Sequence, residues 1–201
     1  MLRGCWTQSM EGVMRRIILI TGPKHSGKSH CARVLAKLMD MAAVDLDGLI
    51  EAQSGKTPRE LYTTGIDSFR KSEVQALASV LKSSKQKNLI IAAGGGLIDN
   101  GEAMALLSEA GPSRLEIITV YLDVSADTAW QRILDDGALP PFLKAGKPND
   151  NPGDYHPWKI HQALHERRAE AYKAMANIIV IAENKKPEEI AGEIARRLVI
   201  F

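Results

Sequence analysis

The chain has 201 residues, which suffices for one α/β domain with a sizeable core and is short for two domains that each bury their own. Its 26 Lys and Arg residues nearly balance 24 Asp and Glu residues, and no long block of one sign occurs. This balance excludes the electrostatic footprint of a protein that binds nucleic acid or an anionic membrane. We therefore expect a soluble protein that acts on a small molecule.

The first residues show no targeting pattern. MLRGCWTQSMEGVMRR lacks the apolar stretch of a signal peptide, and no apolar run approaches the roughly 20 residues that span a bilayer. Cys5 and Cys31 form neither a metal-ligand spacing nor a disulfide framework, as is typical of a reducing compartment. We expect a cytoplasmic protein in which residues 1–13 form an N-terminal extension and residues 14–201 form a single domain.

Short β-type runs alternate with helical periodicity along the chain. The runs are RIILIT (16–21), AAVDLD (42–47), NLIIAA (88–93), LEIITVYL (115–122) and NIIVIA (177–182). This alternation predicts an α/β fold with a parallel sheet and helical crossovers. After the first run and its loop, the spacing of one buried helix face is found at Cys31, Val34, Leu35, Leu38 and Met39.

The segment TGPKHSGKSH (21–30) connects the first strand to this helix and has the spacing G-x-x-x-x-G-K-[ST]. Glycines let backbone N–H groups approach a phosphate, Lys28 offers a charge to the β- and γ-phosphates, and the Ser29 hydroxyl can coordinate Mg²⁺. His25 stands where many small kinases have another glycine, and it can adopt a left-handed conformation at modest cost. The segment predicts an ATP and Mg²⁺ site with nucleotide-binding residues Gly22, His25, Ser26, Gly27, Lys28, Ser29 and His30.

Two arginines lie on the apolar stripes of predicted helices. Arg70 is spaced with Ile66, Val74, Leu77 and Leu81, and Arg168 is spaced with Leu164, Tyr172 and Met175. Because a buried, unpaired guanidinium is costly, each must meet an anion, and Glu73 offers Arg70 an internal partner as the alternative to a ligand. Two such arginines in a P-loop protein favour a shared anionic substrate whose carboxylate they bind.

With these residues in order, the chain resembles the shikimate kinase family. The matching segments are GPKHSGKS (22–29), DLD (45–47), GIDSFRKSE (65–73), AAGGGLI (92–98) and RRAEAYKAMA (167–176). The resemblance implies a three-layer P-loop NTPase fold with a five-stranded parallel sheet, helices on both faces and a lid. It also implies ATP-dependent phosphorylation of a hydroxyl group, with shikimate as the expected acceptor, by a monomer.

The resemblance also implies roles for matching positions. Asp47 corresponds to the aspartate proposed as the catalytic base, which acts together with Lys28, and Asp45 corresponds to one that approaches Mg²⁺ through water. The substrate carboxylate and ring would be held by Arg70, Arg168 and the backbone of Gly94, Gly95 and Gly96. Arg132 and the NKKP loop (184–187), which includes Lys186, fall where the family lines the adenine.

Residues 137–157 form the predicted lid. They contain five of the nine prolines and three glycines, so we expect neither helix nor strand there. Where the family's lid has R-P-L-L, this chain reads LPPFL, with Pro140 at the arginine position and Lys144 and Lys147 as the nearest lid cations.

The loss of a lid arginine leaves three hypotheses. The chain is a shikimate kinase in which Lys144 or Lys147 substitutes, a kinase for another hydroxy-acid or polyol such as gluconate, or a nucleotide-binding protein that has lost catalysis. The retained inward-facing charges disfavour the last, because an idle site has no physical need for them. His161 and His165, at i and i+4, lack a clear third metal ligand, which favours a structural role for both.

Overall fold

The computed structural model describes residues 15–83, 88–110, 115–137, 139–144 and 156–199. The predicted N-terminal extension, residues 1–13, and the lid residue Lys147 lie outside the described residues. Within the described part of the chain, no helix is long and apolar enough to cross a membrane.

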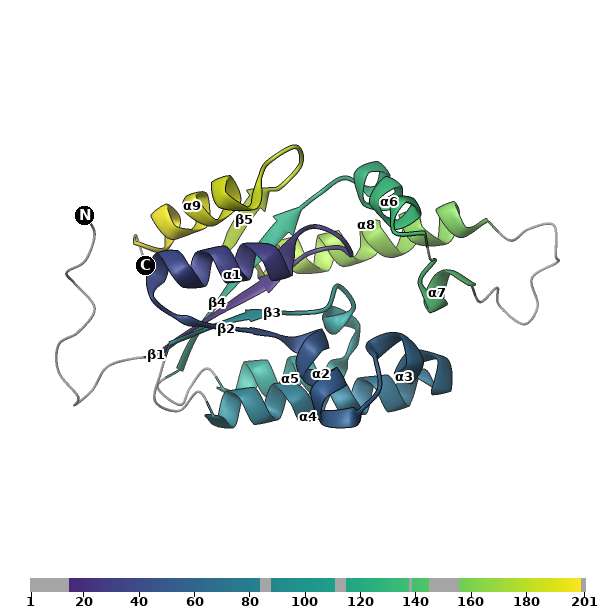
Figure 1. Cartoon of the computed structure of the whole chain (residues 1–201), viewed down its shortest axis with the longest axis horizontal. Coiled ribbons are helices and arrows are strands. Elements are labelled where there is room, and N and C mark those ends of the chain that lie inside the picture. The colour runs from purple at the N-terminus through teal and green to yellow at the C-terminus, as the bar shows by residue number, and fades with distance from the viewer. Residues whose placement is uncertain (1–14, 84–87, 111–114, 138, 145–155, 200–201) are drawn as a thin grey trace.

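Five parallel strands form one sheet in the order β2-β3-β1-β4-β5 (Figure 1). Their bounds are Arg15–Thr21 for β1, Ala42–Asp45 for β2, Leu89–Ala92 for β3, Leu115–Asp123 for β4 and Ile178–Ile181 for β5. The central strand β1 pairs in parallel with β3 and β4, so that Ile17 lies between Leu89 and Ile117. The predicted α/β fold with a five-stranded parallel sheet is confirmed.

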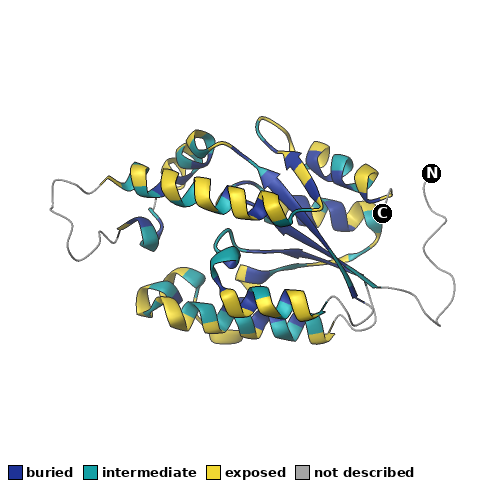
Figure 2. Ribbon diagram, turned by 180° about the vertical axis from the view of Figure 1, so that it is seen from behind, coloured by how far each residue is buried: buried dark blue, intermediate teal, exposed yellow. Residues whose placement is uncertain are grey.

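Helices cover both faces of the sheet, as Figure 1 shows. Helices α1 (Lys28–Met39) and α9 (Pro187–Leu198) pack on one face, and α4 (Ile66–Ser83) and α5 (Gly101–Ala110) pack on the other. Side chains of β1 alternate between the two, with Ile18 and Ile20 toward α1 and Ile17 and Leu19 toward α4. The inner strands β1, β3 and β4 therefore read as apolar runs and are largely buried on both faces, whereas the edge strands β2 and β5 are partly exposed (Figure 2).

The other helices gather near the carboxyl ends of the strands. They are α2 (Leu46–Ser54), α3 (Pro58–Thr64), α6 (Ala126–Asp135), α7 (Pro141–Lys144), α8 (Pro157–Met175) and the short 3-10 helix η2 (Leu97–Asp99). Helices α2 and α3 pack against α4, whereas α6 and α7 pack against α8. The crevice between these groups lies where open parallel sheets bind ligands.

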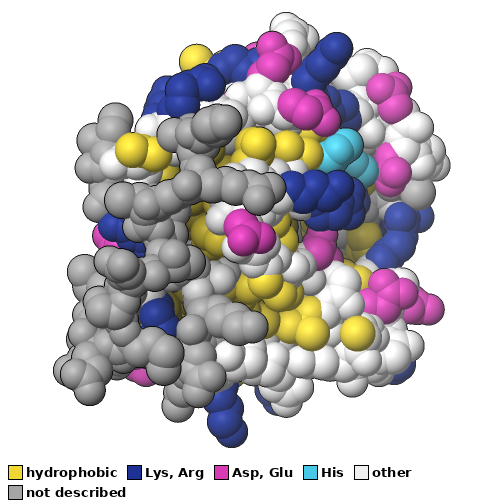
Figure 3. All heavy atoms as spheres, turned by 60° about the vertical axis from the view of Figure 1, so that its left-hand side comes forward, with side chains coloured by type: hydrophobic (Ala, Val, Ile, Leu, Met, Phe, Trp, Pro, Cys, Tyr) yellow, Lys and Arg dark blue, Asp and Glu magenta, His cyan; other side chains and the backbone are white. Residues whose placement is uncertain are grey.

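Charges of both signs are interspersed on the surface that Figure 3 displays, with Asp and Glu side chains lying among Lys and Arg. The described residues visible on this face therefore form no field of a single sign, in agreement with the near balance of charges along the sequence.

Two predicted boundaries differ from the structure. Helix α2 begins at Leu46, so Asp47 lies in its first turn and not in a strand, because the Asp45 side chain caps the helix and accepts from Asp47 N–H and Gly48 N–H. In the lid, Pro141 starts the single helical turn α7, where only an irregular loop was expected. Proline suits this first position, since its fixed φ is helical and its missing N–H has no partner there.

The apolar face of α1 also differs slightly from the predicted stripe. Cys31 and Leu35 are fully buried as expected, but Leu38 is 59% exposed, and Ala32 and Ala36 take the inward positions. The helix packs against α9, and both alanines belong to the hydrophobic core that these two helices form with the sheet.

Candidate active site

A broad cleft opens at the carboxyl ends of β1, β2 and β3. Its walls come from the predicted P-loop, the start of α2, the glycine segment after β3, helix α3 and the first residues of the lid. Among the predicted site residues, those that line it are His25, Gly27, Lys28, Ser29, His30, Asp45, Asp47, Gly94, Gly95, Gly96, Arg132 and Arg168. The structure therefore brings most of the predicted nucleotide and substrate residues to one place.

The P-loop is shaped by glycines at points of close backbone approach. A Cβ on Gly22 would lie 2.8 Å from Leu122 O, and its φ of 151° is one that other residues rarely adopt. Gly27 has φ 90° and immediately precedes helix α1, while a Cβ on Gly95 would lie 2.9 Å from Gly22 O. The loop after β3 thus packs backbone to backbone against the P-loop, and the N-terminus of α1 points its free N–H groups into the cleft.

The side chain of Lys28 forms hydrogen bonds to its own loop. Its Nζ donates to Pro23 O at 2.6 Å and to Ser26 Oγ at 3.4 Å. Burial lowers the pKa of Lys28 to about 8, although the charges of Asp47 and Asp45 act in the opposite direction. The two carboxylates therefore do not fully offset the cost of removing this ammonium from water, and an anion bound next to it would stabilise its charged form.

His25 adopts the left-handed conformation predicted for it, with φ 59°. Its carbonyl oxygen accepts a hydrogen bond from Arg132 Nη1 at 2.9 Å, so Arg132 braces the loop from α6 as well as lining the cleft. The imidazole Nε2 is buried without a hydrogen bond and lies 3.7 Å from Asp136 Oδ2. Burial and the neighbouring charge of Lys24 lower the pKa of His25.

Asp45 is the last residue of β2, and Asp47 lies in the first turn of α2. Asp45 is occupied on one oxygen by the N-terminus of α2, whereas Asp47 reaches the end of β3, where a Cβ on Gly94 would lie 3.2 Å from its Oδ1. Partial desolvation of the carboxylate and the charge of Asp45 raise the pKa of Asp47, although the residue as a whole is exposed. A carboxylate with a raised pKa is a stronger base than an ordinary aspartate, which is what proton abstraction from a hydroxyl requires.

Arg168 enters the cleft from α8 and already holds a carboxylate. Its Nε and Nη2 bind Asp99 Oδ2 at 2.8 and 2.7 Å, and Arg167 Nη2 binds the other oxygen of Asp99 at 2.9 Å. The guanidinium also lies over the ring of Phe142, 5.5 Å from its centroid, and its Nη2 would be 3.4 Å from a Cβ on Gly96. The prediction that Arg168 meets an anion is confirmed, and Asp99 is a partner that the sequence reasoning missed.

Arg70 is placed differently from Arg168. It is half-buried, and it is not among the described residues that line the cleft. No carboxylate of the described residues lies within ion-pair distance of its guanidinium, so the alternative of a close ion pair with Glu73 is wrong. Glu73 is 1% exposed, and its Oε2 accepts instead from Asn100 Nδ2 at 2.9 Å, while its Oε1 has no partner. Burial raises the pKa of Glu73 to about 7.

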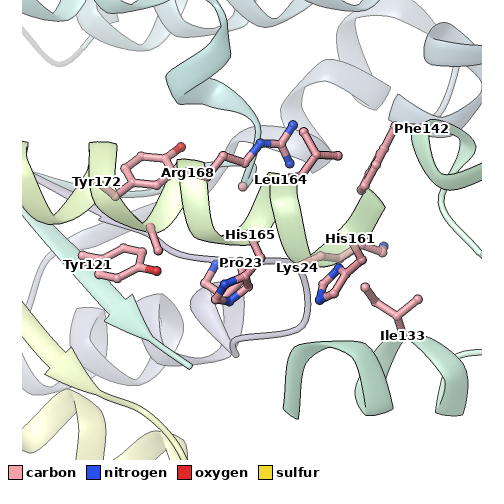
Figure 4. Close-up of a pocket in the computed structure, with 12 residues that line it drawn as sticks. Pro23, Lys24, Tyr121, Ile133, Phe142, His161, Leu164, His165, Arg168 and Tyr172 are labelled. Carbon is pink, nitrogen blue, oxygen red and sulfur yellow. The ribbon is translucent and has the colours of Figure 1, made fainter. Parts of the chain in front are cut away.

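His161 and His165 line a small second cavity beneath α8 (Figure 4). Their Nε2 atoms lie 3.0 Å from Ala126 O and 2.9 Å from Val124 O, so each imidazole bonds a backbone carbonyl. Trp130 and Trp158 pack around His161. These hydrogen bonds and ring contacts fit the structural role that the sequence favoured for both histidines.

The lid and the predicted adenine loop contribute less to the described cleft. Pro140 and Phe142 line it, but Lys144 is exposed and does not, and Lys147 lies outside the described residues. Lys186 lies at the N-terminus of α9, where its N–H donates to Glu189 Oε2 at 2.8 Å, and it is also not among the described residues that line the cleft.

Residues that were not predicted also contribute to this site, among them Lys24, Arg59, Asp99 and Asn100. Lys24 and Arg59 line the cleft, and Arg59 Nη2 donates to Leu139 O at 2.6 Å, joining α3 to the lid. Asp99 and Asn100 directly follow the glycine segment, so a search for partners of the inward-facing arginines and of Glu73 could have found them.

Comparisons with known proteins agree with this geometry. The family described as shikimate kinase matches residues 24–199 of the chain. The shikimate kinase of Sulfurihydrogenibium sp. is 30% identical over 186 residues, covering 92% of this chain and 98% of that protein. The shikimate kinase of Persephonella marina is 31% identical and covers 92% of this chain and 99% of its own length.

Solved structures show the same likeness. The shikimate kinase of Acinetobacter baumannii in complex with shikimate superposes with a TM-score of 0.75 at 25% identity, over 94% of this chain and 95% of that one. A gluconokinase from Sinorhizobium meliloti shares the fold, with a TM-score of 0.58 at 16% identity over 93% of this chain and 97% of the other. Together with the lysine of the P-loop and the arginine of α8 in one cleft, these matches show that the chain belongs to the shikimate kinase family.

Proposed function

We propose that the chain transfers the γ-phosphoryl group of ATP to a hydroxyl group of shikimate. The observation that carries this proposal is that Lys28, Asp47 and Arg168 line one cleft. A cation for a phosphate, a base for a hydroxyl and a cation for a carboxylate are the groups that a kinase of a hydroxy-acid requires.

The P-loop supports nucleotide binding. Its glycines leave room for a phosphate against the backbone, and Lys28 is a half-buried cation whose described hydrogen-bond partners are neutral groups of its own loop. The Ser29 hydroxyl, and Asp45 through water, would hold Mg²⁺, which neutralises charge on the β- and γ-phosphates when bound. Arg132 supports the P-loop through its hydrogen bond to His25 O, and we propose that the adenine lies near Arg132.

Asp47 is placed to activate the acceptor hydroxyl. In the transfer, the hydroxyl oxygen forms a bond to the γ-phosphorus while the bond from that phosphorus to the β–γ bridging oxygen breaks, and the bond's electron pair leaves with ADP. The hydroxyl proton passes to the Asp47 carboxylate. Partial desolvation and the charge of Asp45 raise the pKa of Asp47, which makes this carboxylate a better acceptor for that proton.

Arg168 would bind the substrate carboxylate. It is held in place by Asp99 through Nε and Nη2, so its fork is oriented in advance. Gly96 leaves room beside this guanidinium, and we propose that the backbone N–H groups of Gly94 to Gly96 and the Arg70 side chain complete the substrate site. We further propose that the protein is a cytoplasmic monomer, with no nucleic-acid or membrane partner, for which the near balance of charge is the support.

The test measures ADP release from MgATP with shikimate, with gluconate and without an acceptor, and identifies the product by mass. Shikimate-dependent turnover with formation of a monophosphate is expected. Arg168→Met should raise the KM for shikimate by about 100-fold, because truncating one partner of a charge-assisted pair costs about 2–5 kcal/mol.

Arg167→Met is the matched control. Arg167 binds the same Asp99 but is not among the described residues that line the cleft, so its KM should change by less than about threefold. ATP binding without turnover of shikimate would contradict the proposal, and faster turnover of gluconate would assign the site to a different hydroxy-acid.

A further inference from the structure

Lys24 is the third residue of the P-loop and stands between two cavities. The broad cleft is lined by Lys28 and Asp47, and the small cavity beneath α8 is lined by His161 and Tyr172. Both cavities are lined by Lys24, Gly95, Phe142 and Arg168. Lys24 therefore lies at the junction of the phosphate loop, the carboxylate-binding arginine and the first helical turn of the lid.

The side chain of Lys24 extends beside α8 toward the end of the small cavity that Ile133 and Phe142 form, as Figure 4 shows. Its backbone faces the glycine segment after β3, since Lys24 N would lie 3.4 Å from a Cβ on Gly95. Lys24 is exposed, and the direction of its side chain in Figure 4 places the ammonium toward Phe142, on the lid side of the P-loop.

The ammonium of Lys24 also lacks a partner among the described residues. Other cations of the cleft have partners: Lys28 donates to Pro23 O, Arg132 to His25 O, and Arg168 to Asp99. Lys24 makes no hydrogen bond or ion pair with the residues that the structure describes. Arg33 shares this property, but it lies on α1 and lines only the broad cleft.

Lys24 acts electrostatically on the groups of the reaction. Burial lowers the pKa of Lys28 to about 8, and the positive charge of Lys24 contributes in the same direction. Partial desolvation and the charge of Asp45 raise the pKa of Asp47, and the charges of Lys28 and Lys24 oppose this shift. Such influence on both residues agrees with an ammonium close to the place where the phosphoryl group passes from nucleotide to acceptor.

We propose that Lys24 is a further catalytic residue, which contacts an oxygen of the transferring phosphoryl group from the lid side. This inference rests on the proposed kinase function. In phosphoryl transfer the charge spreads over three equatorial oxygens, so cations on different sides of the group stabilise the transition state. Pro140 carries no charge at the start of the lid and Lys144 is not among the described residues that line the cleft, whereas Lys24 reaches this side from the P-loop.

The experiment compares Lys24→Met and Lys24→Arg with the unmodified protein, and uses Lys37→Met, on the exposed side of α1, as the control. Lys24→Met should lower kcat with MgATP and shikimate by about 100-fold, which is typical for the loss of one preorganised group that stabilises transition-state charge. The KM for shikimate should change by less than about threefold, Lys24→Arg should restore at least about a tenth of the rate, and Lys37→Met should change nothing.

Nucleotide affinity provides a readout that needs no acceptor. Lys24→Met should weaken MgATP binding by about tenfold and leave MgADP binding unchanged, because only ATP carries the γ-phosphate. An unchanged kcat in Lys24→Met, or an equal loss of ATP and ADP affinity with a lowered melting temperature, would overturn the proposal. If the unmodified protein fails to phosphorylate shikimate, the proposed function fails, whereas the difference between ATP and ADP still decides the role of Lys24.

Discussion

The cleft has two sides that are stabilised in different ways. We call the P-loop and the glycine segment that packs on it the phosphate side, and the part around Arg168 and the start of the lid the acceptor side. On the phosphate side, backbone lies against backbone, as at Gly22 and Leu122 and at Gly95 and Gly22. On the acceptor side, long side chains make the contacts, as between Arg168 and Asp99. Aromatic rings continue this side, with Phe142 edge-on to Tyr62 and beneath the Arg168 guanidinium.

The difference decides how each side can vary. A contact between two backbones tolerates no added side chain, so the phosphate side depends on glycine at fixed positions. Contacts between side chains can be exchanged in pairs or replaced by other residues of similar reach. The lid can therefore start with the uncharged Pro140, because Lys24 on the phosphate side supplies a cation to the cleft.

The largest expected effect is that of Lys28→Met on the phosphate side. The rate should fall by about 10³-fold or more, since this ammonium neutralises charge on the transferred group. The melting temperature at pH 7 should rise, because burial that lowers the pKa of Lys28 to about 8 makes its charged form unfavourable in the folded protein. Steady-state kinetics and thermal unfolding test both, and a lower melting temperature would contradict this reading of Lys28.

Next in size is Glu73→Gln on the acceptor side. Burial raises the pKa of Glu73 from 4.5 to about 7, so the folded state holds this proton at a pH where the unfolded chain has released it. Stability should therefore fall as pH rises from about 4.5 to 7, by up to about 3 kcal/mol. Glu73→Gln should remove this slope and be the more stable protein at pH 8, as measured by urea unfolding.

The exposed Glu102 provides the control for this prediction. Glu102→Gln should leave the dependence of the unfolding free energy on pH unchanged. A pH slope that persists in Glu73→Gln would assign the effect to another group.

A matched pair of glycines compares the two sides directly. A Cβ on Gly95 would lie 2.9 Å from the backbone oxygen of Gly22, whereas the nearest atom to a Cβ on Gly96 is Nη2 of the Arg168 side chain, at 3.4 Å. Gly95→Ala should destabilise the protein by about 1–3 kcal/mol and weaken MgATP binding. Gly96→Ala should cost less than about 1 kcal/mol and affect shikimate only, and equal costs for the two would remove the distinction between the sides.

The smallest expected effect is that of Arg59→Met. Arg59 is exposed and joins α3 to the lid through one hydrogen bond to Leu139 O. Its loss should change the unfolding free energy by less than about 1 kcal/mol and raise the KM for shikimate by about threefold. Lys56→Met, an exposed change just before α3, is the control. A large loss of kcat in Arg59→Met would show that the acceptor side also supplies a catalytic cation.

The fold was predictable because its signals are local. Each strand is a short apolar run, and the P-loop is a fixed spacing between one such run and an amphipathic helix. Boundaries were less predictable where one side chain decides them. The β2 run continues to Asp47 by composition, but Asp45 caps α2 and ends the strand two residues earlier.

The site was predictable only in part. The helical stripes predicted that Arg70 and Arg168 face the interior or a cleft, because a helix repeats every 3.6 residues, but of the two only Arg168 is among the described residues that line the cleft. Its partner Asp99 comes from a segment 69 residues away, and Asn100 meets Glu73 across 27 residues. Such pairs follow from the packing of helices and loops, which the periodicity of one segment does not specify.

The parallel sheet also fixes where the described chain starts and ends. Arg15 begins β1, and Leu198 ends α9, which runs back along the sheet, so both lie at the end opposite α7 (Figure 1). A surface tether or a fused second enzyme attached at either point would face away from the mouth of the cleft. The protein is therefore suited to immobilisation through this end, which would leave the proposed nucleotide and acceptor free to enter and leave the cleft.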